Sequence, residues 1–269
     1  MKVGSGIVVP LLDGSGVENP RDVLFRAEST VDAWAEHEDL LDSQGNLELA
    51  VGGYLVRLGD RNILVDAGVG TIDNGKYRGG QFLESLRLQG LEPSDITDVI
   101  FTHLHFDHVG WATKKGAVVF ENATYRVHKL DWDHFVESPS AEPGAVRKLK
   151  PLESRLELFA GDETLAPGFD ARHTPGHSPG STTFIVSSEN ASAALIGDLA
   201  HTPIELVEPH WHFAFDFDPV AAALVRSEFV AEFADTDTTI LAAHFPGMRG
   251  GHLVTDNDTT TWTYNKENR

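Results

Sequence analysis

The sequence predicts an α/β domain in which strands and helices alternate in two halves. Short apolar runs bounded by Gly, Pro, Asn or Asp are typical of strands, and segments of helical spacing lie between them. The chain has 269 residues, of which 41% are hydrophobic, and this is enough to bury a sizeable core. Neither a repeat nor a linker divides it. We therefore expect residues 1–269 to form a single domain, with its halves at roughly 49–130 and 155–262.

The first half is expected to begin with a pair of antiparallel strands. Apolar segments at 50–58 and 62–65 flank a Gly-Asp turn. Helical spacing follows at 81–89 and ends at Gly90, because glycine readily adopts the backbone conformation that ends a helix. The remaining elements expected in this half are short strands at 99–101, 117–120 and 124–127.

The second half is expected to contain one long helix and several strands. The helix begins at Asp218 and Pro219, since aspartate is a good N-cap and proline suits the first helical position. Strands are expected at 182–186, 193–196 and 239–243, and around Leu253 and Trp262. Residues 1–48 show little pattern and are expected to form an irregular N-terminal extension with a short helix at 31–38.

Composition excludes several classes of protein. The absence of cysteine rules out disulfides, thiol nucleophiles and thiolate metal sites, so a bound metal must be held by imidazole and carboxylate groups. The formal net charge of −20 repels phosphate backbones. No apolar run approaches the roughly 20 residues that span a bilayer, and the N-terminus lacks the pattern of a secretion signal. We therefore expect a cytoplasmic protein with no nucleic-acid or membrane partner.

Four residues that can bind metal ions lie close together after a short apolar strand. They are His103, His105, Asp107 and His108. Because His103 and His105 are two residues apart, both project to the same side of an extended chain. Asp107 and His108 follow where the chain must turn, so they can point elsewhere and serve a second metal ion. This spacing at the end of a strand is a poor match for a chance cluster of surface histidines.

Three further candidate ligands are His177, Asp198 and His244. His177 stands in a loop rich in proline and glycine, and the other two follow apolar runs. Taken alone, His177 could belong to a rigid turn and Asp198 could cap a helix or a surface turn. A carboxylate at the end of a buried strand is costly, however, unless it is paired or binds a metal. Since three predicted strands each end in a ligand-type residue, one shared site explains them together.

The order of these residues resembles that of the metallo-β-lactamase superfamily. The match comprises His-x-His-x-Asp-His at 103–108, then His177, Asp198 and His244, and Asp66 matches an aspartate on an early strand of the family. The resemblance implies a four-layer αβ/βα sandwich, in which helices flank two mixed β-sheets. It also implies two divalent metal ions, most simply zinc, with iron, manganese or cobalt as alternatives. One ion would be held by His103, His105 and His177 and the other by Asp107, His108 and His244, with Asp198 as the bridge.

Within the superfamily, the chain most resembles the branch of lactonases and methyl-parathion hydrolase. Asp198 fits this branch, because true zinc β-lactamases lack a bridging aspartate at that step. Some acyl-homoserine lactonases place a tyrosine shortly after this aspartate, whereas residues 199–202 here are Leu, Ala, His and Thr. Early segments of related lactonases often make dimer contacts, so residues 1–48 are expected to do so in a homodimer.

The resemblance and the ligand set together predict a hydrolase. The two cations would share a bridging hydroxide that attacks a lactone or a related small-molecule ester, with Asp107 as general base. A phosphotriesterase or arylesterase on the same site is the alternative. Hydrolysis of β-lactams is disfavoured by Asp198. Oxygen or persulfide chemistry at a single iron would leave Asp107, His108 and His244 without a metal.

Three residues are candidates for contact with the substrate. Phe106 and Trp111 lie near the histidine motif and could supply an apolar wall. His201 lies three residues after Asp198 and could donate a hydrogen bond to a substrate oxygen. The aromatic segment 210–213 could line the same pocket, or form an exposed loop or a dimer contact.

Overall fold

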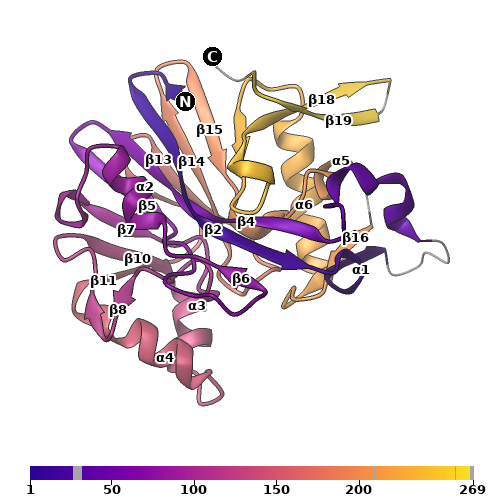
Figure 1. Ribbon diagram of the computed structural model, residues 1–269. Coiled ribbons are helices and arrows are strands. Elements are labelled where there is room, and N and C mark those ends of the chain that lie inside the picture. Colours follow the sequence, from indigo (N-terminus) through magenta and orange to yellow (C-terminus); the bar gives the residue numbers. More distant parts are fainter. Residues whose placement is uncertain (27–31, 209, 258, 267–269) are drawn as a thin grey trace.

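Two large β-sheets lie face to face and helices cover their outer faces, as the computed structural model shows (Figure 1). The structure describes residues 1–26, 32–208, 210–257 and 259–266. The arrangement is the four-layer αβ/βα sandwich that the sequence predicts. The order of the layers is helices, first sheet, second sheet, helices.

The first sheet has eight strands, and its centre is parallel. Pairing is parallel from β5 through β7 and β10 to β11, and antiparallel from β1 through β2 and β4 to β5. The predicted pair of strands at 50–58 and 62–65 is confirmed as β4 and β5. In spatial order the strands are β1 (Lys2–Val3), β2 (Gly6–Glu18), β4 (Leu47–Leu58), β5 (Arg61–Val65), β7 (Asp98–Ile100), β10 (Thr124–His128) and β11 (Leu156–Phe159), and β6 (Tyr77–Arg78) pairs with β2.

The second sheet has seven strands, of which only β15 and β17 pair in parallel among the residues described. The predicted strands of the second half are confirmed as β14, β15, β17, β18 and β19. The strands are β12 (Glu163–Ala166), β13 (Phe169–His173), β14 (Thr182–Ser188), β15 (Ala191–Leu195), β17 (Thr239–Leu241), β18 (Gly251–Asp256) and β19 (Thr259–Tyr264). Two small pairs join β3 (Leu24–Arg26) to β16 (Trp211–Phe213) and β8 (Thr113–Lys114) to β9 (Ala117–Val118).

The helices are short except for α6. They are α1 (Pro20–Val23), α2 (Phe82–Leu88), α3 (Lys129–Trp132), α4 (Pro143–Leu149), α5 (Ile204–Val207) and α6 (Pro219–Phe233). The start of α6 is confirmed, because Asp218 Oδ1 accepts hydrogen bonds from Val220 N and Ala221 N. Within the described ranges, no helix is both long enough and apolar enough to cross a membrane.

The core follows from the alternation of side chains along the strands. On β5, Ile63 and Val65 face the second sheet and pack in one cluster with Phe184, whereas Leu64 faces outward and packs in another with Phe82 of α2. A third cluster lies between the second sheet and α6. The two sheets therefore share a dry interior, and the polar site is confined to the loops at the ends of strands.

The prediction that residues 1–48 form an irregular extension is wrong. β2 pairs with β4 from Ile7↔Arg57 to Glu18↔Leu47, so this segment is part of the first sheet. Its pattern is hard to read because Pro10, two glycines and a β-bulge interrupt the strand. In place of the predicted helix at 31–38 there are 3-10 helices at Ala33–Glu36 and Glu38–Leu40, and Val31 lies outside the described residues.

Asp13 occupies the bulge of β2 and holds a long loop against the first sheet. Its carboxylate is fully buried. Oδ2 accepts hydrogen bonds from Val69 N and Gly70 N, and Oδ1 accepts them from Gly80 N, Phe82 N and Trp111 Nε1. A buried carboxylate is tolerated when donors surround it in this way. Asp13 therefore joins β2, the 67–82 loop and the segment that follows the histidine motif.

We expect Asp13→Ala to destabilise the protein strongly. The change leaves several buried donors without an acceptor, which costs on the order of 3–5 kcal/mol of unfolding free energy. Urea denaturation of the variant measures this loss. Asp237→Ala is the matched control, because Asp237 is exposed and its loss is expected to cost less than about 0.5 kcal/mol. Equal midpoints for the two variants would contradict the role of Asp13.

Candidate metal centre

The candidate ligands converge because three strands end at the same edge of the sandwich. Leu195 and Leu241 are register partners in the parallel pair β15–β17, and Asp198 and His244 each lie three residues beyond them. On the first sheet, His103 lies three residues beyond the end of β7. The carboxyl ends of neighbouring parallel strands meet at one edge, so side chains that follow them face a common space.

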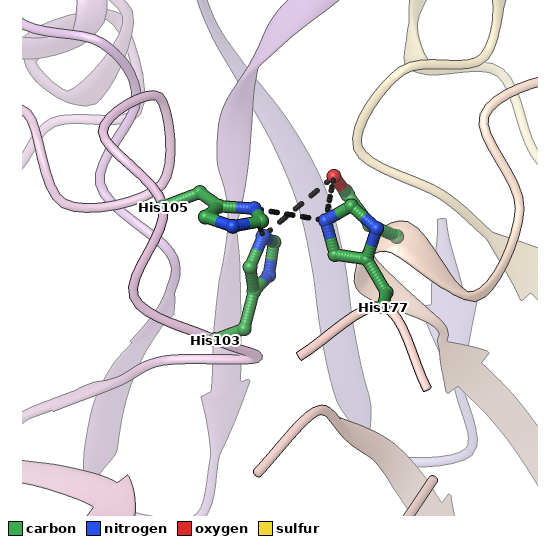
Figure 2. A group of neighbouring side chains, drawn as sticks. His103, His105 and His177 are labelled. Atoms are coloured by element: carbon green, nitrogen blue, oxygen red, sulfur yellow. Dashed lines mark hydrogen bonds and ion pairs between the residues drawn. The ribbon is translucent and has the colours of Figure 1, made fainter. Parts of the chain in front are cut away.

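The first group of ligands comprises three histidines and one aspartate (Figure 2). His103 Nε2 lies 3.0 Å from His105 Nδ1, which lies 2.9 Å from His177 Nε2. Asp198 Oδ2 lies 3.6 Å from His103 Nε2 and 3.3 Å from His177 Nε2. One ligand atom from each residue thus faces a common centre, as the predicted first metal site requires.

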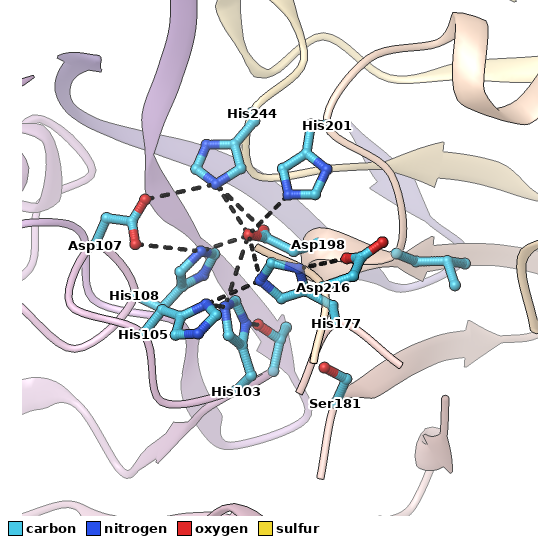
Figure 3. Close-up of polar contacts among 12 residues, drawn as sticks. His103, His105, Asp107, His108, His177, Ser181, Asp198, His201, Asp216 and His244 are labelled. Atoms are coloured by element: carbon cyan, nitrogen blue, oxygen red, sulfur yellow. Dashed lines mark hydrogen bonds and ion pairs between the residues drawn. The ribbon is translucent and has the colours of Figure 1, made fainter. Parts of the chain in front are cut away.

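The second group comprises Asp107, His108 and His244, and Asp198 joins it to the first (Figure 3). Asp107 Oδ1 lies 4.0 Å from His108 Nε2, and Asp107 Oδ2 lies 3.6 Å from His244 Nε2. The second oxygen of Asp198, Oδ1, lies 3.2 Å from Nε2 of both His108 and His244. The Asp198 carboxylate therefore stands between the two groups, where the sequence predicts a bridge.

Outer hydrogen bonds fix the orientation of four of the five imidazoles. The ring nitrogens that face away from the centre each meet an oxygen, and the pairs are His103 Nδ1 with Thr102 Oγ1 at 3.1 Å, His108 Nδ1 with Asp66 Oδ2 at 2.9 Å, His177 Nδ1 with Asp216 Oδ1 at 3.0 Å and His244 Nδ1 with the Ala50 carbonyl oxygen at 2.8 Å. A neutral imidazole that donates from Nδ1 carries a lone pair on Nε2. Those lone pairs point into the two groups.

Two buried atoms at the centre fit a cation better than a hydrogen bond. His108 Nε2 and Asp198 Oδ1 make no hydrogen bond of acceptable geometry with any described residue. Buried polar atoms of this kind are rare unless an ion or a ligand meets them. Imidazole nitrogens and carboxylate oxygens without thiolates suit zinc and similar divalent metals. The residues present therefore fit the two metal ions that the superfamily resemblance implies.

Burial sets the charge of two histidines in the first group, His103 and His105. It lowers the pKa of His103 and of His105 well below the ordinary value, and neighbouring imidazoles lower both further. The neutral ring is the form that binds metal. His108 behaves differently: burial lowers its pKa, but Asp198 and Asp66 outweigh burial and raise it well above the ordinary value. His108 would hold a divalent cation at this position in place of the proton.

Asp131 clamps together the two loops that carry the first group. It lies at the inner side of α3 and is fully buried. Oδ2 accepts a hydrogen bond from Leu104 N at 3.0 Å, between His103 and His105. Oδ1 accepts hydrogen bonds from Ser178 Oγ and Gly180 N, next to His177. Asp131 thus sets the distance between two segments that are far apart in the sequence.

The centre opens into a pocket of about 290 Å³. The pocket is lined by the ligand residues His105, Asp107, His177, Asp198 and His244 and by Glu18, Leu49, Lys76, Tyr77, Phe106, His201, Phe213 and Phe215. Phe106 is 53% exposed and forms an edge-on contact with Tyr77. An apolar wall therefore faces the polar centre, as in many small-molecule sites.

The structure brings two of the three predicted substrate residues to this pocket and places the third elsewhere. Phe106 and His201 line the pocket. Trp111 is buried in the core, donates to Asp13 and is not among the pocket residues. Of the segment 210–213, only Phe213 lines the pocket, where it stacks on His201 with 3.4 Å between ring centroids.

Sequence reasoning did not assign the supporting roles of Asp131, Glu205, Asp216 and Arg226. The side chain of each is buried, and each contacts a residue that lies at least four positions away in the sequence. The one signal available was a charged residue within an apolar stretch, such as Asp216 between two phenylalanines. That signal does not indicate which residue the charged side chain contacts.

Comparison with known proteins identifies the family. A sequence profile of the metallo-beta-lactamase superfamily matches residues 50–244, a segment that contains all the candidate ligands. The chain belongs to this superfamily. An N-acyl homoserine lactonase of Bacillus sp is 28% identical over 198 residues, which are 67% of this chain and 76% of that protein.

Solved structures agree with the sequence relatives. The structure of AidC, a dizinc quorum-quenching lactonase in complex with a product, matches with a TM-score of 0.88 and 26% identity over 100% of this chain and 97% of that chain. The structure of the hydrolase AbOPH matches with a TM-score of 0.83 and 25% identity, over 98% of this chain and 95% of that chain. The predicted superfamily, fold and hydrolase class are thus confirmed.

We expect Asp131→Asn to destabilise the protein, and more so at pH 4 than at pH 7. An amide leaves Leu104 N facing a donor, which costs about 1–3 kcal/mol. Burial outweighs three hydrogen bonds and raises the pKa of Asp131 to about 6. At pH values between the ordinary pKa of aspartate, about 4, and the raised pKa of Asp131, about 6, the native state binds more protons than the unfolded state. The wild type therefore loses stability as pH rises through this range. The asparagine variant lacks this loss.

Urea unfolding of both metal-free proteins at several pH values measures the difference. The gap in unfolding free energy between wild type and variant is expected to narrow by up to about 3 kcal/mol from pH 4 to pH 7. A gap that widens over this range would show that Asp131 is ionised throughout and would contradict the raised pKa.

Proposed function

We propose that this chain is a lactonase that opens N-acyl homoserine lactones at a centre of two zinc ions. The observation that carries this proposal is the position of Asp198, with one carboxylate oxygen toward each ligand group. Support for the substrate class comes from the similarity to a Bacillus N-acyl homoserine lactonase and to AidC. The nitrogen and oxygen donors suit zinc, and iron, manganese or cobalt would also be accepted by such a set.

The ligand roles follow the two groups. His103, His105 and His177 would hold one ion, Asp107, His108 and His244 the other, and Asp198 would contact both. Bound there, divalent cations would lower the pKa of a water molecule and polarise the substrate carbonyl. The outer hydrogen bonds set the orientation of four of the five imidazoles in advance, so little reorganisation of these ligands accompanies the reaction.

Asp107 and His201 are placed to handle protons and hydrogen bonds in the pocket. Asp107 belongs to the second group and also lines the pocket, and its carboxylate can accept a proton from the attacking water and pass it to the leaving alkoxide. His201 Nε2 lies 3.3 Å from Asp198 Oδ2. Burial lowers the pKa of His201, but Glu205 and Asp198 outweigh burial and raise it to about 10. Because His201 lines the pocket beside Asp198, its ring N–H is the group that we propose to donate a hydrogen bond to a substrate oxygen.

The pocket walls suit an acyl chain beside a polar ring. Phe106, Phe213 and Phe215 give the pocket apolar surface, and Lys76 and Glu18, which also line it, form an ion pair with 2.7 Å between Nζ and Oε2. An apolar tail can lie against the aromatic rings while the lactone carbonyl meets the centre. An aryl ester or a phosphotriester could use the same walls, so both belong in any test of specificity. The single domain, a homodimer through residues 1–48 and a cytoplasmic location stay predictions.

Metal content of the purified protein, measured with a substrate panel, tests this function. The panel contains N-acyl homoserine lactones of several chain lengths, an aryl ester, a phosphotriester and a β-lactam. We expect about two zinc ions per chain and the highest kcat/KM on a lactone, with activity lost on chelation and restored by zinc. A higher kcat/KM on the phosphotriester than on any lactone would overturn the lactonase proposal in favour of a phosphotriesterase. One iron per chain with no hydrolysis would overturn the dinuclear proposal.

We expect His201→Ala to lower kcat on the preferred lactone by about 10²-fold, because a donor to the developing oxyanion is lost. Zinc content is expected to stay at the wild-type value, since His201 is outside both ligand groups. His252→Ala, on β18 and outside the pocket, is the matched control with unchanged kinetics. Steady-state kinetics with metal analysis measures both. An unchanged kcat would show that His201 has no part in the mechanism. A loss of zinc from His201→Ala would show that His201 binds the metal.

A further inference from the structure

Arg226 of α6 is a buried cation behind the candidate centre. It is 5% exposed and shares the inner face of the helix with Ala222, Phe229 and Phe233. A guanidinium in such a position is costly unless its donors are matched by acceptors. Its surroundings therefore indicate what it does.

Two backbone carbonyls fix the plane of this guanidinium. Nε donates to the Leu199 carbonyl oxygen and Nη1 donates to the Trp211 carbonyl oxygen, each at 2.9 Å. Leu199 directly follows Asp198 in the 3-10 helix Gly197–Leu199. Because a guanidinium is planar, these two bonds also fix the direction of its remaining nitrogen, Nη2.

Nη2 faces two buried carboxylates that belong to different segments. It lies 3.4 Å from Glu205 Oε1 and 3.9 Å from Asp216 Oδ2. Burial raises the pKa of Glu205, but Arg226 and His201 outweigh burial and keep it below the ordinary value. One cation is thus shared between two anions that would otherwise be buried with less compensation.

Each carboxylate in turn contacts a histidine of the site. The other oxygen of Asp216, Oδ1, lies 3.0 Å from Nδ1 of His177, whose Nε2 belongs to the first ligand group (Figure 3). Glu205 Oε1 lies 3.5 Å from Nδ1 of His201, and Glu205 Oε2 accepts a hydrogen bond from the His201 backbone N–H at 2.6 Å. His177 and His201 both line the pocket.

We propose that Arg226 is a positioning residue for the hydrolytic reaction, and that it acts through two arms. Through Asp216 it orients His177 toward the first metal ion, and through Glu205 it orients His201 toward the substrate. Its bond to the Leu199 carbonyl also steadies the turn that carries Asp198. One side chain outside the pocket thereby couples metal binding to substrate activation. The His201 arm rests on the lactonase proposal, whereas the His177 arm concerns metal binding alone.

The test uses Arg226→Lys, which keeps the charge but lacks the planar fork. Zinc affinity is measured by competition with a chelator, and kcat and KM are measured on the ester that the wild type hydrolyses fastest. We expect zinc affinity to fall about 10- to 100-fold, as for other groups that orient a metal-binding histidine. With zinc saturating, we expect kcat to fall at least about 10-fold while KM changes less than about threefold. Arg172→Lys, at an exposed ion pair with Glu232, is the matched control.

Variants of the two carboxylates separate the two effects, and they also test the proposal if Arg226→Lys folds poorly. Asp216→Asn is expected to weaken zinc binding about 10- to 100-fold and to lower kcat at saturating zinc less than Glu205→Gln does. Glu205→Gln is expected to lower kcat while zinc affinity stays unchanged. In the double variant with Arg226→Lys, the loss of kcat caused by Glu205→Gln is expected to be smaller than in the wild type, because both act on His201.

A folded Arg226→Lys protein with wild-type zinc affinity and wild-type kcat would overturn the proposal. Equal effects of Asp216→Asn and Glu205→Gln on both readouts would also overturn it, since that result shows general destabilisation rather than two arms. The zinc competition needs no substrate. If the wild type hydrolyses no lactone, the lactonase proposal fails on its own, and the zinc affinities of Arg226→Lys and Asp216→Asn still decide the His177 arm.

Discussion

The convergence of imidazole nitrogens and carboxylate oxygens on one small volume is the constraint on which the rest of the structure depends. Asp198 lies at its centre, within 3.2–3.6 Å of Nε2 of His103, His108, His177 and His244. Such groups compete for the same protons when they are buried without cations, and bound divalent ions satisfy them together. The surrounding structure must hold these groups in place whether or not the ions are bound, because hydrolysis requires a fixed geometry.

The rigidity comes from two layers of contacts. The sheets supply the first, because His103, Asp198 and His244 lie three residues beyond the ends of β7, β15 and β17, and His177 lies four residues beyond the end of β13. Buried carboxylates supply the second: Asp13 and Asp131 hold backbone N–H groups, and Asp66 and Asp216 hold imidazoles. These carboxylates contribute to the negative charge that the sequence shows, so part of that charge lies inside the molecule and supports the site. An acidic composition is therefore not only a property of the surface here.

The sequence was most informative where the chemistry is local. His103, His105, Asp107 and His108 lie within six residues, and the apolar runs before Asp198 and His244 are clear strands, so the structure places the predicted ligands together. It was least informative where a role depends on tertiary contact. Arg226 and Glu205 meet only after α5 and α6 pack, and a single sequence gives no sign of that pairing. Trp111 was expected near the substrate because of its place in the chain, but its indole N–H is taken by Asp13 in the core. β2 was missed because glycines and a bulge hide its alternation.

The dinuclear centre is the claim from which the function and the role of Arg226 both follow. Anomalous diffraction from crystals of the zinc-loaded protein, recorded on both sides of the zinc absorption edge, tests it most directly. We expect two zinc peaks, one among His103, His105 and His177 and one among Asp107, His108 and His244, with an oxygen of Asp198 beside each. A single peak in the first group, with Asp107, His108 and His244 bound to no metal at saturating zinc, would contradict it.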